Sequence, residues 1–383
     1  MEENSIIVRY SEIFLKSERV FRIYESKLIK NILDHLKREN VKAEVKRAER
    51  GRIFIFTNEV KSCLNVLKNI FGIHSFSPAI YLKTREKEEL AKFIRENYER
   101  LIPKNKTFAI RVNRSFDTEY TSKELESYLG SFVERKVDLE KPDVQINFDI
   151  RKIGTFVYTQ IYQGPKGLPI SSSGRVISLL SGGIDSPVAS YFAMKRGCEV
   201  VYLHFSGFPI TSKKSIEKVE KIVKVLNKYQ IRSKLYVAKI GEYQLKMKNL
   251  IDPKYLIIMY RRLMFRVAEK IAKSENAEAL VTGESLAQVS SQTLHNLKVI
   301  ENVVKIPVLR PLIGFDKEEI IEISKRIGTY DISIMPCEDT CSLFAPKHSS
   351  AFVNEEKVKE FEKLIDINKI VKKIVKETEV KLI

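Results

Sequence analysis

The sequence predicts an α/β protein whose N-terminal part is α+β and whose C-terminal part contains a parallel sheet. Up to residue 163, short strands and helices follow one another in an order typical of helices packed on one face of a sheet. Beyond residue 174, short apolar strands alternate regularly with helices, which is typical of a parallel sheet covered on both faces. The stretch between them, GPKGLPISSSG, is rich in glycine, proline and serine and marks a boundary.

The first seventy residues predict a βαββα unit. Strand-like runs predict a strand over 5–10 and a hairpin over 43–57 that turns around Gly51. Apolar residues at helical spacing predict a helix over 19–39 and a second over 60–72, which Gly72 would end.

The next ninety residues predict a second α+β group. They give a strand and helix over 79–102, a strand over 107–116, a helix over 121–136 capped by Thr121 or Ser122, and paired strands over 144–150 and 155–164.

The C-terminal part predicts strands over 175–180, 198–205, 234–240 and 278–285, with helices over 187–197, 212–230 and 255–277. Right-handed crossovers would make this sheet parallel. Ligands of such sheets bind beyond the carboxyl ends of the strands. The last residues, 356–383, predict one amphipathic Lys/Glu helix.

Charge and hydropathy limit the function classes. The 383 residues carry 67 Lys and Arg against 49 Asp and Glu, a net charge of +18, which favours a polyanionic partner such as nucleic acid. A heat-adapted surface would explain many charges of both signs, but less easily the imbalance. No apolar run reaches the roughly 18 residues of a membrane helix, and the N-terminus is unlike a secretory signal. We therefore expect a cytoplasmic protein that contacts no membrane.

The four cysteines fall into two kinds. Cys63 and Cys198 lie in apolar segments and are expected to be small buried residues. Cys337 and Cys341 lie in MPCEDTCSLF, a polar, loop-like segment in which a thiol is accessible. Four cysteines in a chain of this length do not make a disulfide scaffold.

The junction SGGIDS, residues 181–186, carries the clearest chemical signal. Gly182 and Gly183 can adopt positive φ and bring backbone N–H groups close to a ligand. Ser186 can cap the following helix, whose N-terminus would attract a phosphate or pyrophosphate. Asp185 suits a magnesium ion or the turn itself. The sequence contains neither a Walker A loop nor a G-x-G-x-x-G fingerprint.

SGGIDS resembles the pyrophosphate loop, S-G-G-x-D-S, of adenylating ATP pyrophosphatases. Further segments, at 164–169, 259–272, 281–297 and 310–321, together with RYSEIFLKS and FGIHSFSPA, are similar to those of the tRNA 4-thiouridine synthetase (ThiI) family. The resemblance implies a ferredoxin-like domain over 1–75, an RNA-binding THUMP domain over 76–165, a linker over 166–174, and a PP-loop ATP pyrophosphatase domain over 175–383. The last domain would have the fold of the adenine nucleotide alpha-hydrolases.

The resemblance also implies an activity. The family adenylates the 4-carbonyl of uridine 8 in tRNA with ATP and then replaces that oxygen with sulfur, which gives 4-thiouridine. ATP and Mg²⁺ are the implied cofactors, with Asp185 as the catalytic and metal-binding carboxylate. The positions that match nucleotide contacts are Leu179, Leu180, Ser181, Gly182, Gly183, Asp185, Ser186, His204, Phe205, Arg261, Gly283 and Gln292.

Sulfur transfer is expected to use Cys341, which matches the cysteine that the family places in this domain. The family pattern resembles P-Y-E-D-C-C, whereas this chain has Thr340 in place of the first cysteine and a further thiol at Cys337. In a helical turn, a spacing of four residues brings two α-carbons to about 6 Å, within disulfide range. We therefore expect that one thiol carries a persulfide and the other resolves it.

Some relatives carry a C-terminal rhodanese domain, which the final segment of this chain does not resemble, so a role in thiamine synthesis is in doubt. A cysteine desulfurase or free sulfide would supply the sulfur, and a homodimer is compatible with the family. The alternatives are another PP-loop tRNA-thiolating enzyme, an amide-forming synthetase, or an RNA-binding protein with an inactive nucleotide site. Cys341 argues against the amide-forming enzyme, and the intact SGGIDS argues against the inactive one.

Overall fold

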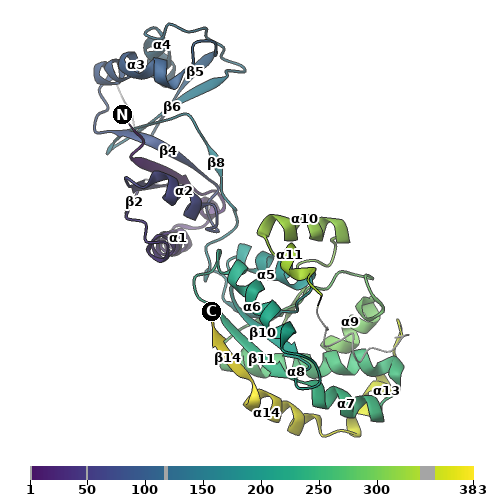
Figure 1. The fold of residues 1–383 in the computed structure, drawn as a ribbon. Helices are drawn as coiled ribbons and strands as arrows, with labels where there is room; N and C mark the ends of the chain where they lie inside the picture. The colour runs from purple at the N-terminus through teal and green to yellow at the C-terminus, as the bar shows by residue number, and fades with distance from the viewer. Residues whose placement is uncertain (1, 49–50, 116–119, 337–349) are drawn as a thin grey trace. The chain divides into compact units, whose positions relative to one another are not determined.

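The structure is a computed structural model that describes residues 2–48, 51–115, 120–336 and 350–383. These residues form two compact units, one up to Pro169 and one from Ile170 to Ile383. Figure 1 shows the ribbon of each unit, and we describe the two separately.

The first unit is built on one antiparallel-dominated sheet. Its described strands follow the order β2-β3-β1-β4-β7-β6-β5, and β8 pairs with β4. Ile6 of β1 lies opposite Ile55 of β3, and β5 and β6 are parallel. The strands are β1 (Ser5–Arg9), β2 (Glu44–Arg47), β3 (Arg52–Phe56), β4 (Ser75–Leu82), β5 (Phe108–Arg114), β6 (Val144–Arg151), β7 (Gly154–Tyr158) and β8 (Tyr162–Gln163).

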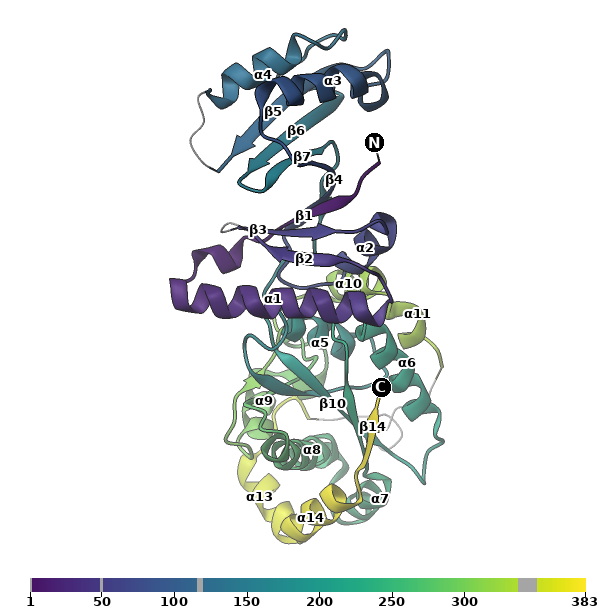
Figure 2. The same cartoon turned by 90° about the vertical axis from the view of Figure 1, so that its left-hand side faces the viewer.

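Two separate clusters of apolar side chains hold helices against this sheet. The helices are η1 (Glu12–Leu15), α1 (Glu18–Arg38), α2 (Val60–Leu67), α3 (Lys87–Leu101) and α4 (Ser122–Gly130). Helices α1 and α2 share a core with β1 and β3, and α3 and α4 share one with β5 and β6 (Figure 2). The expected cap of α4 is confirmed, because Thr121 and Glu124 form a reciprocal capping box. Helix α2 ends at Leu67, so Gly72 lies in the following turn, with a φ of +99°.

The second unit contains the predicted parallel sheet, in the order β13-β12-β9-β10-β11-β14. Its strands are β9 (Arg175–Leu179), β10 (Glu199–Ser206), β11 (Lys234–Lys239), β12 (Ala279–Val281), β13 (Val308–Leu309) and β14 (Glu379–Leu382). The strands β9 to β13 pair in parallel, as expected from the alternation of strands and helices. The carboxyl ends of β9, β10 and β12 therefore meet at one edge.

The helices of this unit cover its sheet, and the long apolar helix α8 lies at the centre of the largest core. They are α5 (Asp185–Lys195), α6 (Lys214–Leu226), α7 (Gly241–Leu250), η2 (Pro253–Tyr255), α8 (Leu256–Ser274), η3 (Ser290–Gln292), α9 (Leu294–Glu301), α10 (Lys317–Ile327), α11 (Tyr330–Ser333), α13 (Glu355–Lys363) and α14 (Ile367–Glu377). Tyr260 and Phe265 of α8 are completely or almost completely buried in the core that this helix shares with the sheet.

The expectation of a single C-terminal helix is wrong. Residues 355–383 form α13, α14 and the strand β14, which runs antiparallel to β11 with Val380 opposite Tyr236. The sheet is therefore mixed at this edge. Helix α13 ends at Lys363, and Asp366 caps the start of α14 by accepting from the backbone N–H of Lys369.

Helix α13 contributes Glu362, a mostly buried carboxylate that joins it to α8. Glu362 accepts hydrogen bonds from Arg262 at 2.8 Å and from Arg266 at 2.6 Å. Burial alone would raise the pKa of Glu362, but the bonds from the two guanidinium groups outweigh it and lower that pKa. A lowered folded-state pKa stabilises the protein above the unfolded value of about 4.3, and this stability is lost as the pH falls through the folded pKa.

We therefore expect Glu362→Gln to lower stability at neutral pH and to make the loss of stability below about pH 5 shallower than in the wild type. Denaturant unfolding at pH 7 and at pH 4 measures both effects. Glu360→Gln, at an exposed position of the same helix, is the control and should leave both values unchanged. A Glu362 variant with the wild-type dependence on pH would contradict the assignment.

Candidate active site

The junction after β9 forms a compact loop, residues 181–186, which we call the PP loop. Its bends are held by serine side chains: the Ser186 hydroxyl accepts from the backbone N–H of Ser181 at 2.9 Å, and the Ser181 hydroxyl accepts from that of Gly183 at 3.3 Å. The two hydroxyl oxygens lie 3.0 Å apart. The pair of serines thus fixes the backbone of a loop that is partly open to solvent.

Two expectations for this loop are wrong in detail. Neither Gly182 nor Gly183 adopts a positive φ. A Cβ on Gly182 would lie 3.0 Å from Cδ of Lys218, so a lack of room, and not a left-handed backbone, favours glycine there. Helix α5 begins at Asp185, with Ile184 as its cap, because the Ser186 hydroxyl is engaged inside the loop.

Asp185, at the first position of α5, has two partners from distant parts of the chain. Lys317 Nζ lies 2.5 Å from its Oδ1, and Gln288 Nε2 lies 3.0 Å from its Oδ2. Lys317 is the first residue of α10, which packs against α5 (Figure 1). It lies in the quoted segment RPLIGFDKEEII, but nothing in the sequence gave it a role, because 132 residues separate it from Asp185.

Gly283 lies against the start of α5. A Cβ at this position would be 2.7 Å from the backbone N of Ser186 and 2.8 Å from the carbonyl carbon of Asp185. Two backbones therefore touch here, which only glycine allows. The residues that follow β12 therefore lie directly beside the PP loop.

The neighbour of Gly283, Glu284, is the centre of a buried ion cluster that the sequence did not reveal. It is 2% exposed, pairs with Arg261 and accepts from Arg310 Nε at 2.6 Å and from the Thr282 hydroxyl at 2.8 Å. Arg310 also contacts Glu301 at 2.6 Å. Arg261, an expected nucleotide contact, is therefore held by Glu284. Glu284 follows Gly283, whose backbone touches the PP loop.

Removing the charge of Glu284 should be costly, because Arg261 and Arg310 would lose their shared buried partner. We expect Glu284→Gln to lower the free energy of unfolding by roughly 3–5 kcal/mol and to weaken ATP binding. Thermal unfolding and an ATP titration measure the two effects. Glu301→Gln is the matched control, since Glu301 also contacts Arg310 but is 40% exposed and should cost at most about 1 kcal/mol. Equal losses in the two variants would contradict the central role of Glu284.

The remaining expected nucleotide contacts also lie at this edge. Leu180 donates its backbone N–H to the carbonyl of Leu203 at 2.8 Å, and its own carbonyl lies 3.0 Å from His204 Nδ1, so the end of β9 is tied to β10. His204 and Phe205 are buried. Gln292 lies in η3, and its side-chain oxygen is buried without a hydrogen-bond partner among the described residues. A buried acceptor of this kind needs a donor.

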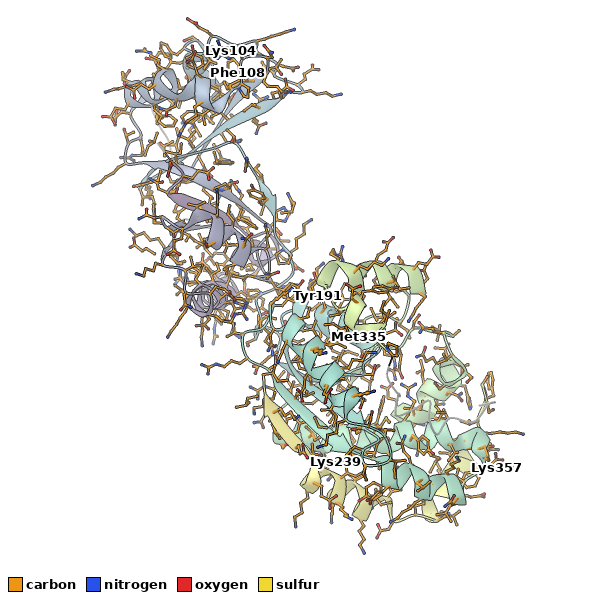
Figure 3. The ribbon with its side chains drawn as sticks, in the orientation of Figure 1. Lys104, Phe108, Tyr191, Lys239, Met335 and Lys357 are labelled. Carbon is orange, nitrogen blue, oxygen red and sulfur yellow. The ribbon has the colours of Figure 1, made fainter. Side chains whose placement is uncertain are left out.

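Lys218 of α6 joins the PP loop to α11. Its ammonium group donates to the carbonyl oxygens of Ser333 at 2.8 Å and of Met335 at 2.7 Å (Figure 3 labels Met335). The Ser333 hydroxyl donates to the carbonyl of Gly183 at 3.2 Å. The described segment ends at Pro336, one residue later.

The cysteines divide as expected where the structure describes them. Cys63 and Cys198 are buried. Burial, with a contribution from Glu59, raises the pKa of Cys63 to about 12, and burial also raises the pKa of Cys198. Neither thiol is therefore a ready nucleophile at neutral pH. Cys337 and Cys341 lie outside the described residues.

Asp185 is the carboxylate that the PP loop offers to a metal ion. Across the described residues, no group of three or more His, Cys, Asp or Glu side chains could hold a metal. Mg²⁺ commonly binds through one or two carboxylates together with substrate phosphates. Asp185 fits that role only when bound phosphates complete the shell and Lys317 or Gln288 releases one of its oxygens.

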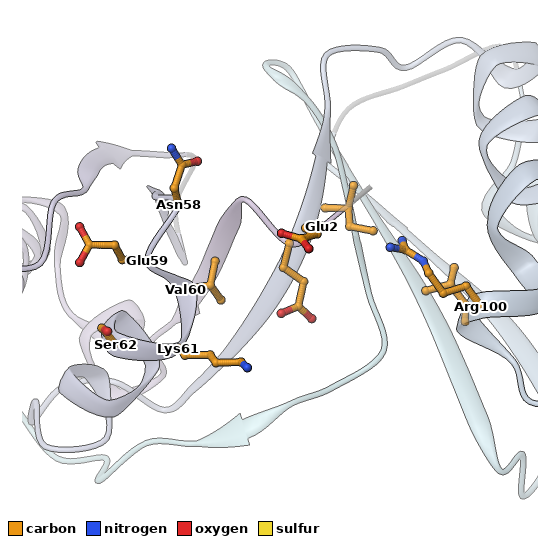
Figure 4. A pocket seen from close by; sticks show the side chains of 10 residues that line it. Glu2, Asn58, Glu59, Val60, Lys61, Ser62 and Arg100 are labelled. Carbon is orange, nitrogen blue, oxygen red and sulfur yellow. The ribbon is translucent and has the colours of Figure 1, made fainter.

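The first unit contains a separate cavity of about 510 Å³ (Figure 4). Its lining includes the carboxylates of Glu2, Glu3 and Glu59 beside Lys61 and Arg100. Burial raises the pKa of Glu3, against the opposing effect of Arg100 and Lys61. A lining with three carboxylates does not suit a phosphate, so we assign it no role in binding RNA.

Comparison with known proteins decides the family. Residues 171–367 match the family described as Thiamine biosynthesis protein (ThiI), residues 5–77 match the ThiI ferredoxin-like domain, and residues 85–160 match the THUMP domain. The chain belongs to the ThiI family. A probable tRNA sulfurtransferase of Methanothermobacter thermautotrophicus is 39% identical, with 98% of this chain and 97% of the relative covered. One of Brevibacillus brevis is 36% identical, with coverage of 99% and 96%.

A solved structure agrees with this family. The crystal structure of a 4-thiouridine synthetase–RNA complex with bound ATP matches with a TM-score of 0.90 and 36% identity, and the match covers 100% of both chains. The ferredoxin-like, THUMP and PP-loop folds expected of a ThiI protein are therefore confirmed. No described helix is both long and apolar enough to cross a membrane.

Proposed function

We propose that this chain is an ATP-dependent tRNA sulfurtransferase that adenylates the 4-carbonyl of uridine 8 and replaces its oxygen with sulfur. The observation that carries the proposal is the match, over the full length of both chains, to a 4-thiouridine synthetase in complex with RNA and ATP. The geometry of the PP loop supports it, because serine-braced backbone and a helix N-terminus suit the pyrophosphate that leaves.

ATP would lie along the edge formed by β9, β10 and β12. The backbones of Leu179, Leu180, His204 and Phe205 end on one side of the PP loop, and Gly283 touches it on the other. Arg261 supplies positive charge, and Gln292 has a buried oxygen that a ligand donor would satisfy. Mg²⁺, held by Asp185 and the phosphates, would neutralise charge on the leaving pyrophosphate.

The uridine oxygen is a poor leaving group, and adenylation turns it into AMP, which leaves readily. In the second step the terminal sulfur of a cysteine persulfide attacks C4, the C4–O bond breaks, and AMP departs with the former carbonyl oxygen. The second thiolate then attacks the persulfide-bearing cysteine sulfur, which forms a Cys337–Cys341 disulfide and releases 4-thiouridine. A thiol reductant returns the disulfide to two thiols.

Sulfur would come from a cysteine desulfurase. The described structure supports Cys341 and Cys337 as the carriers, because the other two cysteines are buried and have raised pKa values. RNA would contact the first unit through its phosphates and its shape, as suits a basic protein. A homodimer and a cytoplasmic location are further expectations of this proposal.

Thiolation of unmodified tRNA with ATP, Mg²⁺ and sulfide tests the function. We expect near-ultraviolet absorbance of 4-thiouridine and one AMP released for each sulfur inserted. Asp185→Asn should abolish both products, since the loop would lose its carboxylate. Release of AMP without any change in the tRNA, or transfer of sulfur to another position, would instead favour a different PP-loop enzyme.

A further inference from the structure

A shallow cavity of about 340 Å³ lies beside the PP loop, and no expected nucleotide contact lines it. Two turns form it, residues 285–288 after β12 and residues 313–317 after β13. The turns are joined by a hydrogen bond from the backbone N–H of Leu286 to the carbonyl of Ile313, at 3.1 Å, and by one from the Ser285 hydroxyl to Phe315, at 2.7 Å. The cavity is thus a built feature of the ligand edge of the sheet.

The cavity shares a wall with the reacting site. Gln288 reaches Asp185 from the first turn at 3.0 Å, and Lys317 reaches it from the second at 2.5 Å. In the strand order β13-β12-β9-β10, both turns lie on the opposite side of the PP loop from His204 and Phe205. A group in the cavity would approach Asp185 from the side away from these two nucleotide contacts.

The lining combines apolar faces with polar groups at the rim. Leu286 is 41% exposed and Ile313 is 39% exposed, so apolar side chains of both turns face the cavity. The polar lining includes the Gln288 amide and the Lys317 ammonium, together with Ser285 and Asp316, whose side chains are engaged by Phe315 and by the first turn of α10. A pyrimidine base has two apolar faces and an edge of carbonyl and imide groups, so its chemistry matches this lining. A base taken out of a folded RNA needs such a pocket.

We propose that this cavity receives the target uracil and presents its 4-carbonyl to the nucleotide at the PP loop. The inference rests on the proposed function, which supplies the RNA substrate, but assigns a base subsite to residues that the resemblance left without a role. Leu286 and Ile313 contact the faces of the base, and Gln288 and Lys317 lie at its polar edge.

Gly314 gives a direct test, because it lines the cavity and a Cβ there would meet nothing within 4 Å. Gly314→Val therefore adds volume to the cavity from a Cβ that meets nothing in the fold within 4 Å. We expect unchanged equilibrium affinity for ATP and for tRNA, since neither the PP loop nor the first unit is altered. The kcat/KM for tRNA-dependent AMP release should fall roughly 10- to 200-fold, the range by which one methylene group more or less changes the fit of a substrate to an apolar site.

Leu382→Ala is the matched control for a truncated exposed apolar side chain, because Leu382 of β14 is 82% exposed and pairs with Lys234 at the amino end of β11, away from the ligand edge of the sheet. It should release AMP at the wild-type rate. Ile313→Ala, a truncation at an exposed position of the lining, is a second test and should also lower the kcat/KM for tRNA-dependent AMP release. Melting temperatures confirm that all three variants fold.

The outcomes separate the two proposals. Wild-type AMP release by both Gly314→Val and Ile313→Ala would overturn the base subsite, and so would a loss of ATP affinity equal to the loss of rate, which would place the nucleotide in the cavity. If the wild-type protein released no AMP in the presence of tRNA, the proposed function itself would fail.

Discussion

Gly283→Ala is expected to abolish ATP-dependent thiolation while leaving the fold in place. The added methyl carbon would stand 2.7 Å from the backbone N of Ser186 and 2.8 Å from the carbonyl carbon of Asp185. Neither atom belongs to a flexible side chain, so the start of α5 must move away from β12. A displacement of about 1 Å in a reacting group can cost 100-fold in rate, and here Asp185 and the phosphate-binding backbone shift together.

Calorimetric ATP binding and the tRNA thiolation assay measure this loss. We expect weaker ATP binding as well as a rate at least about 100-fold lower, because the PP loop holds the ground-state phosphates too. Gly130→Ala places the same methyl group in the first unit, where nothing lies within 4 Å, and should bind ATP as the wild type does. An alanine variant with wild-type ATP affinity would show that the close approach of the two backbones is unnecessary.

Cys341→Ala and Cys337→Ala are each expected to abolish sulfur transfer from a persulfide donor while retaining adenylation. If one thiol carries the persulfide and the other resolves it, removal of either stops the cycle before 4-thiouridine is released. The assay supplies cysteine, a cysteine desulfurase and a thiol reductant, and it measures 4-thiouridine and AMP separately.

Sulfide added in place of the desulfurase is the control, because hydrosulfide can attack the adenylated base directly and needs no protein thiol. Both variants should then form 4-thiouridine again. An active Cys337→Ala in the desulfurase assay would leave Cys341 working alone, with an external thiol as the resolving group. Cys63→Ala, at a buried position, should leave sulfur transfer unchanged.

The parallel sheet and the PP loop were predictable because their signals are local. Apolar strands such as 175–180 and the serines and glycines of SGGIDS lie within a few residues of one another. The strand β14 was missed because its partner, β11, is about 150 residues away, and its four residues resemble the preceding Lys/Glu helix.

The side chains around Asp185 were unpredictable for the same reason. Lys317 and Gln288 lie 132 and 103 residues from it, and only the fold brings them together. Glu284 follows the expected contact Gly283, but no local pattern distinguishes a buried carboxylate from an exposed one. Its pairing with Arg261 and Arg310 required the packing of α8 and β13 beside β12.

Lys218 holds α11 by donating to two carbonyl oxygens, which carry no net charge. These carbonyls leave the net charge of the ammonium in place, and Cδ of Lys218 lies 3.0 Å from where a side chain on Gly182 would begin. If the PP loop binds phosphates as proposed, a phosphate at Gly182 would compete with the two carbonyls for the same cation. Binding of the nucleotide would then weaken the attachment of Lys218 to the end of α11, and by linkage a weaker attachment would favour binding of the nucleotide.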